Sequence, residues 1–299
     1  MKGEIRQVSY DRELGIEACF FEGISQPFPP HFHEYYVVGF IESGRRRLSV
    51  CGKEFTAETG DILLFNPRDN HFCRGLDGNT LTYGAFNIKS EAMEKLASKT
   101  AGIREPLRFS ENLVRDGDLF LSVKRLHEAV MRPQENILCC HNFTGKANSL
   151  PRREKVSATA LHEKEELFLL TFSRLIAEYS ERSENEARAV PERRVETEKA
   201  CLYMQENFSE HISLDKLCRL TALSRAALVR SFAKEKGISP YRYLENIRLE
   251  AARRFLEQGE APVEAALKTG FSDQSHFTNF FRSYIGLTPK QYGNIFKTR

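Results

Sequence analysis

The sequence predicts an α+β protein of two domains, a β-rich N-terminal domain with flanking helices and an all-α C-terminal domain. Its 299 residues suit about two domains of ordinary size. Short β-branched and aromatic runs alternate with turn residues over 31–88, whereas apolar residues recur at helical spacing from about 195 onward. The predicted domains are 1–180 and 195–299, joined by a charged linker poor in hydrophobic residues at 181–194.

Composition excludes several classes of protein. With 41% hydrophobic and 28% charged residues the chain is typical of a globular protein, and no apolar run is long enough to span a bilayer. The N-terminus lacks the apolar core of a signal peptide. Seven scattered cysteines are an odd number for a disulfide framework and favour free thiols in a reducing compartment. We therefore expect a cytoplasmic protein with no membrane partner.

The β-rich region is typified by GFIESGRRRLSVCGKEFTAETGDILLFNP, in which SG, CG and TGD turns separate short strands. This pattern predicts a sandwich or barrel. Two amphipathic helices are predicted after it, separated by a polar, irregular excursion at 132–160. Their apolar stripes are Leu119, Val123, Leu126 and Val130 in the first helix, and Phe168, Phe172, Leu175, Ile176 and Tyr179 in the second. Leu167 and Leu170 lie outside the second stripe, so more than one face of that helix is apolar. The helix either packs deeply, which we favour, or forms a dimer seam.

An internal repeat marks the C-terminal domain. The segment 223–243, LSRAALVRSFAKEKGISPYRY, matches residues 272–292, which lie 49 residues later within GFSDQSHFTNFFRSYIGLTPKQY (270–292). The matched pairs are Ser224 with Asp273, Leu228 with Phe277, Phe232 with Phe281, Gly237 with Gly286, Pro240 with Pro289, and Tyr243 with Tyr292. Ser and Asp suit helix N-caps, the apolar pairs lie one turn apart, and Gly followed by Pro ends one helix and opens the next. Much of the aromatic content of this segment is therefore structural and anchors the two repeat helices to two small cores.

Each repeat helix follows a short helix candidate and a tight turn. SLDKLCRL (213–220), N-capped by Ser213, precedes the first, and PVEAALKTG (262–270) precedes the second. This order predicts two helix-turn-helix units, whose second helices enter the major groove of DNA. A connecting helix of about 17 residues, roughly 25 Å long, would let them reach successive grooves about 34 Å apart. Residues 195–299 also carry 16 Lys and Arg against 12 Asp and Glu, while the first 194 residues carry 28 against 29.

On these motifs, residues 197–297 resemble the double helix-turn-helix domain of the AraC/XylS family of bacterial transcription regulators. The resemblance implies a sequence-specific DNA-binding regulator, in most members an activator that contacts RNA polymerase, and commonly a homodimer. Ala226 and Ala227 stand where many members carry larger groups, so we expect few base contacts from the first unit.

The exposed faces of the repeat helices supply the candidate DNA contacts. A long Arg can hold guanine O6 and N7, Gln or Asn can pair with adenine, and a Thr methyl can touch thymine. Base contacts are predicted for Arg225, Ala226, Arg230, Gln274, Ser275, Thr278 and Asn279. Phosphate contacts are predicted for Ser224, Lys234, Ser272, Arg282 and Lys290, and Arg225 suits a phosphate as well. A merely solvated helix surface is the alternative for each, and the repeat favours DNA.

The N-terminal segment 29–71 resembles the small cupin-type β-barrel with which many AraC-like regulators bind effectors. The resemblance rests on His31-x-His33, Gly44, Gly60-Asp61, Asn66-Pro67 and His71. Three imidazoles suit a divalent metal, but Val37 and Val38 stand where metal-binding cupins carry a Glu, and Glu34 should point to the other side of a strand. We expect a metal-free pocket, without cofactor, in which His31, His33, Tyr35 and His71 bind a small-molecule effector; a metal site and purely structural histidines are the alternatives.

Together these features predict a non-enzymatic, effector-controlled transcription regulator whose partner is double-stranded DNA. Two alternatives are a metal-dependent cupin enzyme with a helical tail and a DNA-binding protein without a ligand. Stoichiometric bound metal would favour the enzyme, and a well-formed polar pocket would count against the protein without a ligand.

Overall fold

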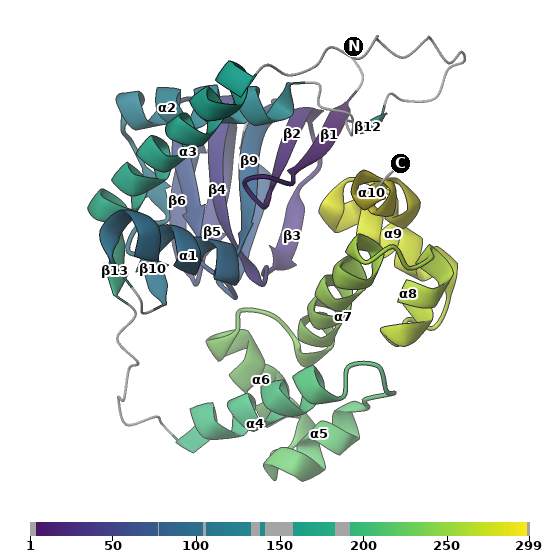
Figure 1. The fold of residues 1–299 in the computed structure, drawn as a ribbon. Coiled ribbons are helices and arrows are strands. Elements are labelled where there is room, and N and C mark those ends of the chain that lie inside the picture. Colours follow the sequence, from purple (N-terminus) through teal and green to yellow (C-terminus); the bar gives the residue numbers. More distant parts are fainter. Residues whose placement is uncertain are drawn as a thin grey trace.

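A computed structural model describes residues 4–76, 78–103, 106–132, 138–140, 158–182 and 192–297. Antiparallel strands form two main sheets in the N-terminal domain (Figure 1). The larger sheet has the order β11 (Leu113–Val114), β7 (Ile62–Phe65), β4 (Tyr35–Ser43), β9 (Leu81–Lys89), β2 (Ile16–Ile24), β1 (Ile5–Asp11) and β12 (Leu138–Cys140). The smaller has the order β3 (Phe28–His31), β8 (His71–Gly75), β5 (Arg45–Val50) and β6 (Lys53–Glu58). The predicted fold class is confirmed.

Among the described residues, two long strands, four strands of two or three residues (β10 to β13) and the helix α1 lie outside the region 31–88 that the sequence pattern marked. β1 and β2 precede residue 31, and α1 (Ser90–Ala101) follows β9 directly. β2 has the sequence IEACFFEGI, and most of its side chains are buried on both faces. A strand buried on both faces shows no alternation of apolar and polar residues, so the period that reveals strands is missing. A short ladder of β10 (Leu107–Phe109) and β13 (Ser180–Arg182) completes the strands of the described residues.

The outer face of the larger sheet is covered by α1, α2 (Gly117–Met131) and α3 (Ala158–Tyr179) (Figure 1). The predicted stripes of α2 and α3 pack in one core with sheet residues such as Val38 and Phe86, which confirms both helices. Leu167 is partly buried against this core, but the Leu170 side chain is 64% exposed. Of the predicted excursion at 132–160, residues 133–137 and 141–157 lie outside the described part of the chain.

The C-terminal domain consists of helices in two groups joined by α7 (Pro240–Glu257) (Figure 1). The first group is α4 (Glu192–Glu206), α5 (Leu214–Thr221) and α6 (Arg225–Glu235), and the second is α8 (Pro262–Lys268), α9 (Gln274–Ile285) and α10 (Pro289–Phe296). α4 begins at Glu192 and β13 ends at Arg182, so regular structure enters both ends of the predicted linker 181–194. No helix among the described residues is long and apolar enough to cross a bilayer.

The repeat is confirmed in its local structure. The Ser224 and Asp273 side chains accept hydrogen bonds from the backbone N–H of Ala227 and His276, as N-caps do. Gly237 and Gly286 have φ of +69° and +86°, the left-handed conformation that ends a helix cheaply only at glycine.

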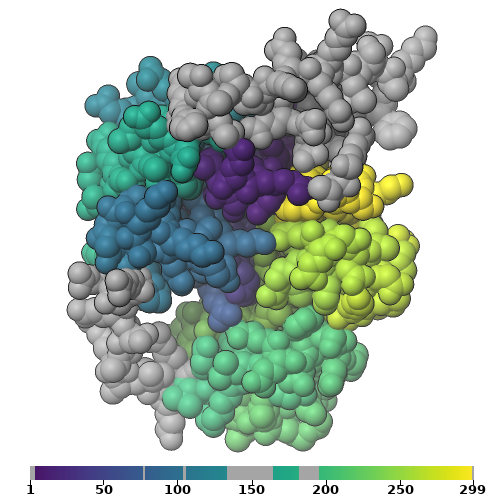
Figure 2. Space-filling view, in the orientation of Figure 1, coloured from purple at the N-terminus to yellow at the C-terminus, as the bar shows by residue number. Residues whose placement is uncertain are grey.

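The domains do not have wholly separate cores. Residues such as Phe21 and Leu48 form an apolar cluster between the two sheets, and this cluster continues into Phe277 and Phe281 of the second helix-turn-helix unit. The first unit has its own core around Phe232, which Phe32 of the barrel joins. Figure 2 shows the close packing, with the purple N-terminal strands directly against the yellow C-terminal helices. The second unit is therefore part of the wall of the barrel.

Candidate nucleic-acid interface and effector cavity

The first helix-turn-helix unit is formed by α5 and α6. Leu228 and Phe232 are fully buried, which turns the opposite face of α6 to solvent. The predicted contact residues Ser224, Arg225, Ala226, Arg230 and Lys234 are all exposed. Arg225 already holds Asp215 of α5 in a two-pronged ion pair, with N–O distances of 2.6 and 2.7 Å. Water and salt screen such an exposed pair, so it does not prevent Arg225 from turning to a phosphate or a base.

The second unit is formed by α8 and α9. Phe277 and Phe281 are fully buried, and the predicted contact residues Gln274, Ser275 and Asn279 are exposed while Thr278 is half-buried. The predicted phosphate contacts Ser272, Arg282 and Lys290 are also exposed. The structure thus brings the two predicted sets of contact residues to the surfaces of α6 and α9 and their caps.

The two helices differ in their surroundings. Asn279 and Arg282 of α9 line a groove of about 330 Å³ whose other wall includes Arg6 and Gln26 of the barrel domain. A Cβ on Gly286, at the end of α9, would lie 2.8 Å from the Arg6 side chain. The C-terminal half of the predicted reading face of α9 therefore lies next to the barrel, and DNA would compete with the barrel for it.

The barrel encloses a cavity of about 120 Å³ between its two sheets. Residues of both sheets line it, and Tyr284 and Ile285 at the end of α9 close one side. His31, His33, Tyr35 and His71, the predicted effector-binding residues, all lie on its wall. The structure therefore brings all four together, from β3, β4, β8 and the turn between β3 and β4.

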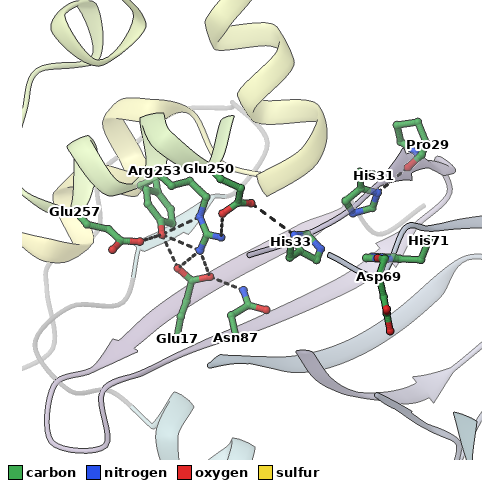
Figure 3. A network of polar contacts seen from close by, with 11 residues as sticks. Glu17, Pro29, His31, His33, Asp69, His71, Asn87, Glu250, Arg253 and Glu257 are labelled. Carbon is green, nitrogen blue, oxygen red and sulfur yellow. Dashed lines mark hydrogen bonds and ion pairs between the residues drawn. The ribbon is translucent and has the colours of Figure 1, made fainter. Parts of the chain in front are cut away.

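The three histidines form a compact cluster (Figure 3). Their ring centroids lie 4.4 to 5.1 Å apart, and His31 also contacts Tyr284 of α9 at 5.4 Å. Burial, and then the neighbouring imidazole His71, lowers the pKa of His31 to about 3. Burial likewise lowers the pKa of His71 to about 3 and that of His33 well below its usual range. All three rings are therefore neutral near pH 7.

Hydrogen bonds determine the tautomers of two of these rings. His31 Nδ1 donates to the carbonyl of Pro29 at 2.7 Å, and His71 Nδ1 donates to the carbonyl of Asp69 at 2.9 Å. In a neutral ring this leaves Nε2 as an acceptor, able to accept from a ligand or to coordinate a metal. One nitrogen from each of the three rings lies within 4.8 Å of the others. Zn–N bonds are about 2.0–2.1 Å long, so a metal would have to draw the rings closer together.

Beside this cluster, a buried ionic network crosses from the barrel to the helices (Figure 3). Arg253 of α7 donates to the Glu17 carboxylate of β2 at 3.1 and 3.2 Å, and Tyr292 of α10 donates to it at 2.8 Å. The guanidinium of Arg253 also lies over the ring of Tyr35, 4.4 Å from its centroid. Glu250, whose pKa burial raises, lies 3.4 Å from Arg253 and 3.8 Å from His33. The network links a cavity-lining carboxylate, Glu17, to the helix that joins the two units.

These features define a class of protein, a barrel-bearing DNA-binding protein with two helix-turn-helix units and an internal ligand cavity. Comparison with known sequences agrees: residues 13–143 match the model of an AraC-like ligand binding domain, and residues 217–294 match a helix-turn-helix domain. The chain is 40% identical over 276 residues to the uncharacterized HTH-type transcriptional regulator YbfI of Bacillus subtilis, covering 92% of this chain and 90% of that one. The chain belongs to the AraC family of transcription regulators and is a DNA-binding regulator, not an enzyme.

Two further comparisons extend over most of the chain. The HTH-type transcriptional activator RhaS of Escherichia coli is 25% identical over 264 residues, 88% of this chain and 86% of that one. The crystal structure of an apo variant of ToxT from Vibrio cholerae matches with a TM-score of 0.52 at 12% identity, over 97% of this chain and all of that one. The second likeness supports the two-domain fold.

Proposed function

We propose that this regulator activates transcription, and that a small molecule bound in the barrel cavity controls its binding to DNA. The observation that carries the proposal is that the barrel and the helix α9 together form the wall of the cavity. Tyr284 and Ile285 border it and belong to α9, the helix that also carries Gln274, Ser275, Thr278 and Asn279. A small molecule in the cavity therefore contacts a helix that is expected to read DNA. Because that contact changes when the domains rearrange, the small molecule can bind two arrangements of the domains with different affinity.

In this proposal, α6 and α9 read bases, and Ser224, Lys234, Ser272, Arg282 and Lys290 contact phosphates. His31, His33, Tyr35 and His71 contact the effector without a metal, as neutral acceptors and aromatic surfaces. Activation is supported by the relative RhaS, which is named as an activator. Contact with RNA polymerase, a homodimeric state and action in the cytoplasm, where bacterial DNA lies, are parts of the same proposal.

Genome-wide mapping of bound DNA, combined with transcript measurements in a deletion strain, tests this function. We expect a small number of sites with paired half-sites beside promoters, and reduced transcription of the neighbouring genes when the protein is missing. Purified protein should bind those sites in vitro and should contain no stoichiometric metal. Binding without sequence preference would contradict the proposal, as would equal transcription in both strains.

A further inference from the structure

One arginine on the cavity wall has no counter-charge in the part of the chain that the structure describes. Arg46 of β5 is 1% exposed and lines the cavity, and its Nη2 donates to the carbonyl of Ile24. Its Nε and Nη1 are buried without a hydrogen-bond partner, and no described carboxylate forms an ion pair with it. Its neighbours along the chain, Arg45 and Arg47, pair with Glu58 and Glu54 at the surface. Removing a charge from water without a partner costs much free energy, so an unpaired buried guanidinium indicates a missing anion.

The strand pairing places this guanidinium beside the cavity. Arg46 lies opposite Gly75 of β8, and a Cβ at residue 75 would lie only 3.0 Å from Arg46 Nη1. The glycine thus leaves room for the planar guanidinium. On the same face of β5, Leu48 and Val50 continue the wall toward Cys73 and His71. Arg46 therefore stands at one end of the wall and the histidine cluster at the other.

The other titratable groups on the cavity wall do not neutralise Arg46. Burial raises the pKa of Cys73 to about 11 and that of Tyr83 well above its usual range, so both are uncharged near pH 7. Glu17 is charge-paired with Arg253. The three histidines are neutral. As far as the described residues go, the cavity wall therefore carries one uncompensated positive charge.

The rest of the wall is largely apolar and partly aromatic. Phe21 and Phe28 each contact Tyr83, with ring centroids 5.3 and 6.0 Å apart, and Leu48 and Leu81 complete this side. The volume of about 120 Å³ is comparable to that of a buried apolar cavity of roughly 150 Å³ that accepts benzene. The space thus suits an apolar body about as large as one ring.

We infer that the effector is a small organic monocarboxylate, whose carboxylate pairs with Arg46 and whose apolar body lies among these rings. A guanidinium with unpartnered N–H groups can donate a charge-assisted hydrogen bond to a carboxylate, whose negative charge also balances it. The inference rests on the proposed function in one respect: it assumes that the cavity is the effector site.

Direct binding to the full-length protein without DNA tests the inference. The probes are benzoate, its uncharged analogue benzamide, hexanoate with hexanamide, and acetate, at constant pH and ionic strength, followed by calorimetry and by the melting temperature. We expect benzoate or hexanoate to bind roughly ten- to a hundredfold more tightly than its amide, the range for hydrogen bonds to a charged group. Acetate, which lacks the apolar body, should bind more weakly than both larger acids.

Arg46→Met removes the charge and puts an unbranched apolar side chain at this position, and Arg47→Met is the matched control on the surface of the same strand. We expect the first variant to lose the preference for carboxylate over amide and the second to retain it. Equal binding of acid and amide by the wild-type protein would overturn the inference, as would an undiminished preference in Arg46→Met. The wild-type comparison needs no variant, so a folding defect in Arg46→Met does not affect it.

Failure of this inference and failure of the proposed function are distinguishable. If the protein binds specific promoters but shows no preference for carboxylates, the ligand class is wrong and the regulator remains. If carboxylates bind through Arg46 but no specific promoter is bound, the cavity chemistry stands and the regulatory function is wrong.

Discussion

Among single residues, the buried histidines make stability depend on pH. His127 of α2 lies between the larger sheet and the helices that cover it. Its Nε2 donates to the Cys19 carbonyl at 2.8 Å, and its ring packs against Phe40. Burial lowers its pKa to about 4, and the pKa values of His31 and His71 to about 3. In an unfolded chain a histidine has a pKa of about 6.5. Between these values the unfolded chain binds protons that the folded protein does not.

The sign of the effect follows from this difference. The stabilisation that each neutral, buried histidine contributes is fully present above about pH 6.5. It is lost as the pH falls toward the folded-state pKa of about 4 or 3, by about 1.4 kcal/mol per pH unit for each such histidine. We predict that His127→Leu reduces the slope of unfolding free energy against pH, between about pH 6 and 5, by the equivalent of about one proton. Urea denaturation at several pH values measures it. His211→Leu, at an exposed position, is the control; an unchanged slope in His127→Leu would contradict the burial argument.

At the scale of elements, the two reading helices can be tested separately. We predict that Arg230→Ala in α6 and Asn279→Ala in α9 each weaken binding to a mapped operator by about 1–3 kcal/mol, because each removes hydrogen bonds to a base edge. Competition with operators altered at single base pairs measures the loss of specificity. Lys95→Ala, an exposed residue of α1 in the barrel domain, is the control. Unaltered binding by both variants would show that these faces do not read the operator.

Phosphate contacts have a different signature. We predict that Arg282→Ala weakens binding to all DNA sequences about equally and lowers the slope of log affinity against log salt by about 1. Fluorescence anisotropy with specific and unrelated duplexes over a range of salt concentrations measures both quantities. A loss confined to the specific duplex would instead assign Arg282 to a base.

The helix α3 has an exposed apolar side chain that could form a contact between two protomers. Leu170 is 64% exposed on α3, while Leu167 packs against the core between the larger sheet and its covering helices. The packing interpretation therefore accounts for one of the two leucines that lie outside the stripe. We predict that Leu170→Glu shifts a homodimer toward monomer, measured by light scattering over a range of concentrations. Leu267→Glu, equally exposed on α8, should leave the assembly unchanged; a dimer that persists in Leu170→Glu would exclude this face.

For the whole molecule, the ionic network couples the barrel to the DNA-binding helices. Removing the Glu17 charge leaves Arg253 buried without its main partner, which weakens the contact between domains. Because Asn279 and Arg282 border the barrel, we predict that Glu17→Gln binds the operator more tightly without effector, by at least about fivefold. Glu165→Gln, in an exposed ion pair with Lys99, is the control. A fall in stability with unchanged operator affinity would mean that the network is only structural.

Much of the C-terminal domain could be predicted because its signals are local. N-caps, left-handed glycines and one-turn apolar pairs act within a few residues, so Ser224, Asp273, Gly237 and Gly286 are recognisable from the chain alone. The strands β1 and β2 and the helix α1 were not predicted, β2 because a strand buried on both faces loses its alternation. In the site, the histidines were found through the resemblance of the segment 29–71 to a cupin-type barrel. Arg46 was not, although the two-residue period of a strand places it on the same face as the apolar residues Leu48 and Val50.

The sequence by itself determined the two-domain organisation, the repeated units and the faces of α6 and α9, because periodicity and capping encode them locally. Only the tertiary structure decided that the barrel core continues into the second unit, that Tyr284 closes the cavity, that Glu17 meets Arg253, and that Arg46 has no counter-charge among the described residues. The physical reason is distance along the chain: Glu17 and Arg253 are 236 residues apart. Burial and charge pairing between such segments depend on how the domains pack, and no local pattern records it.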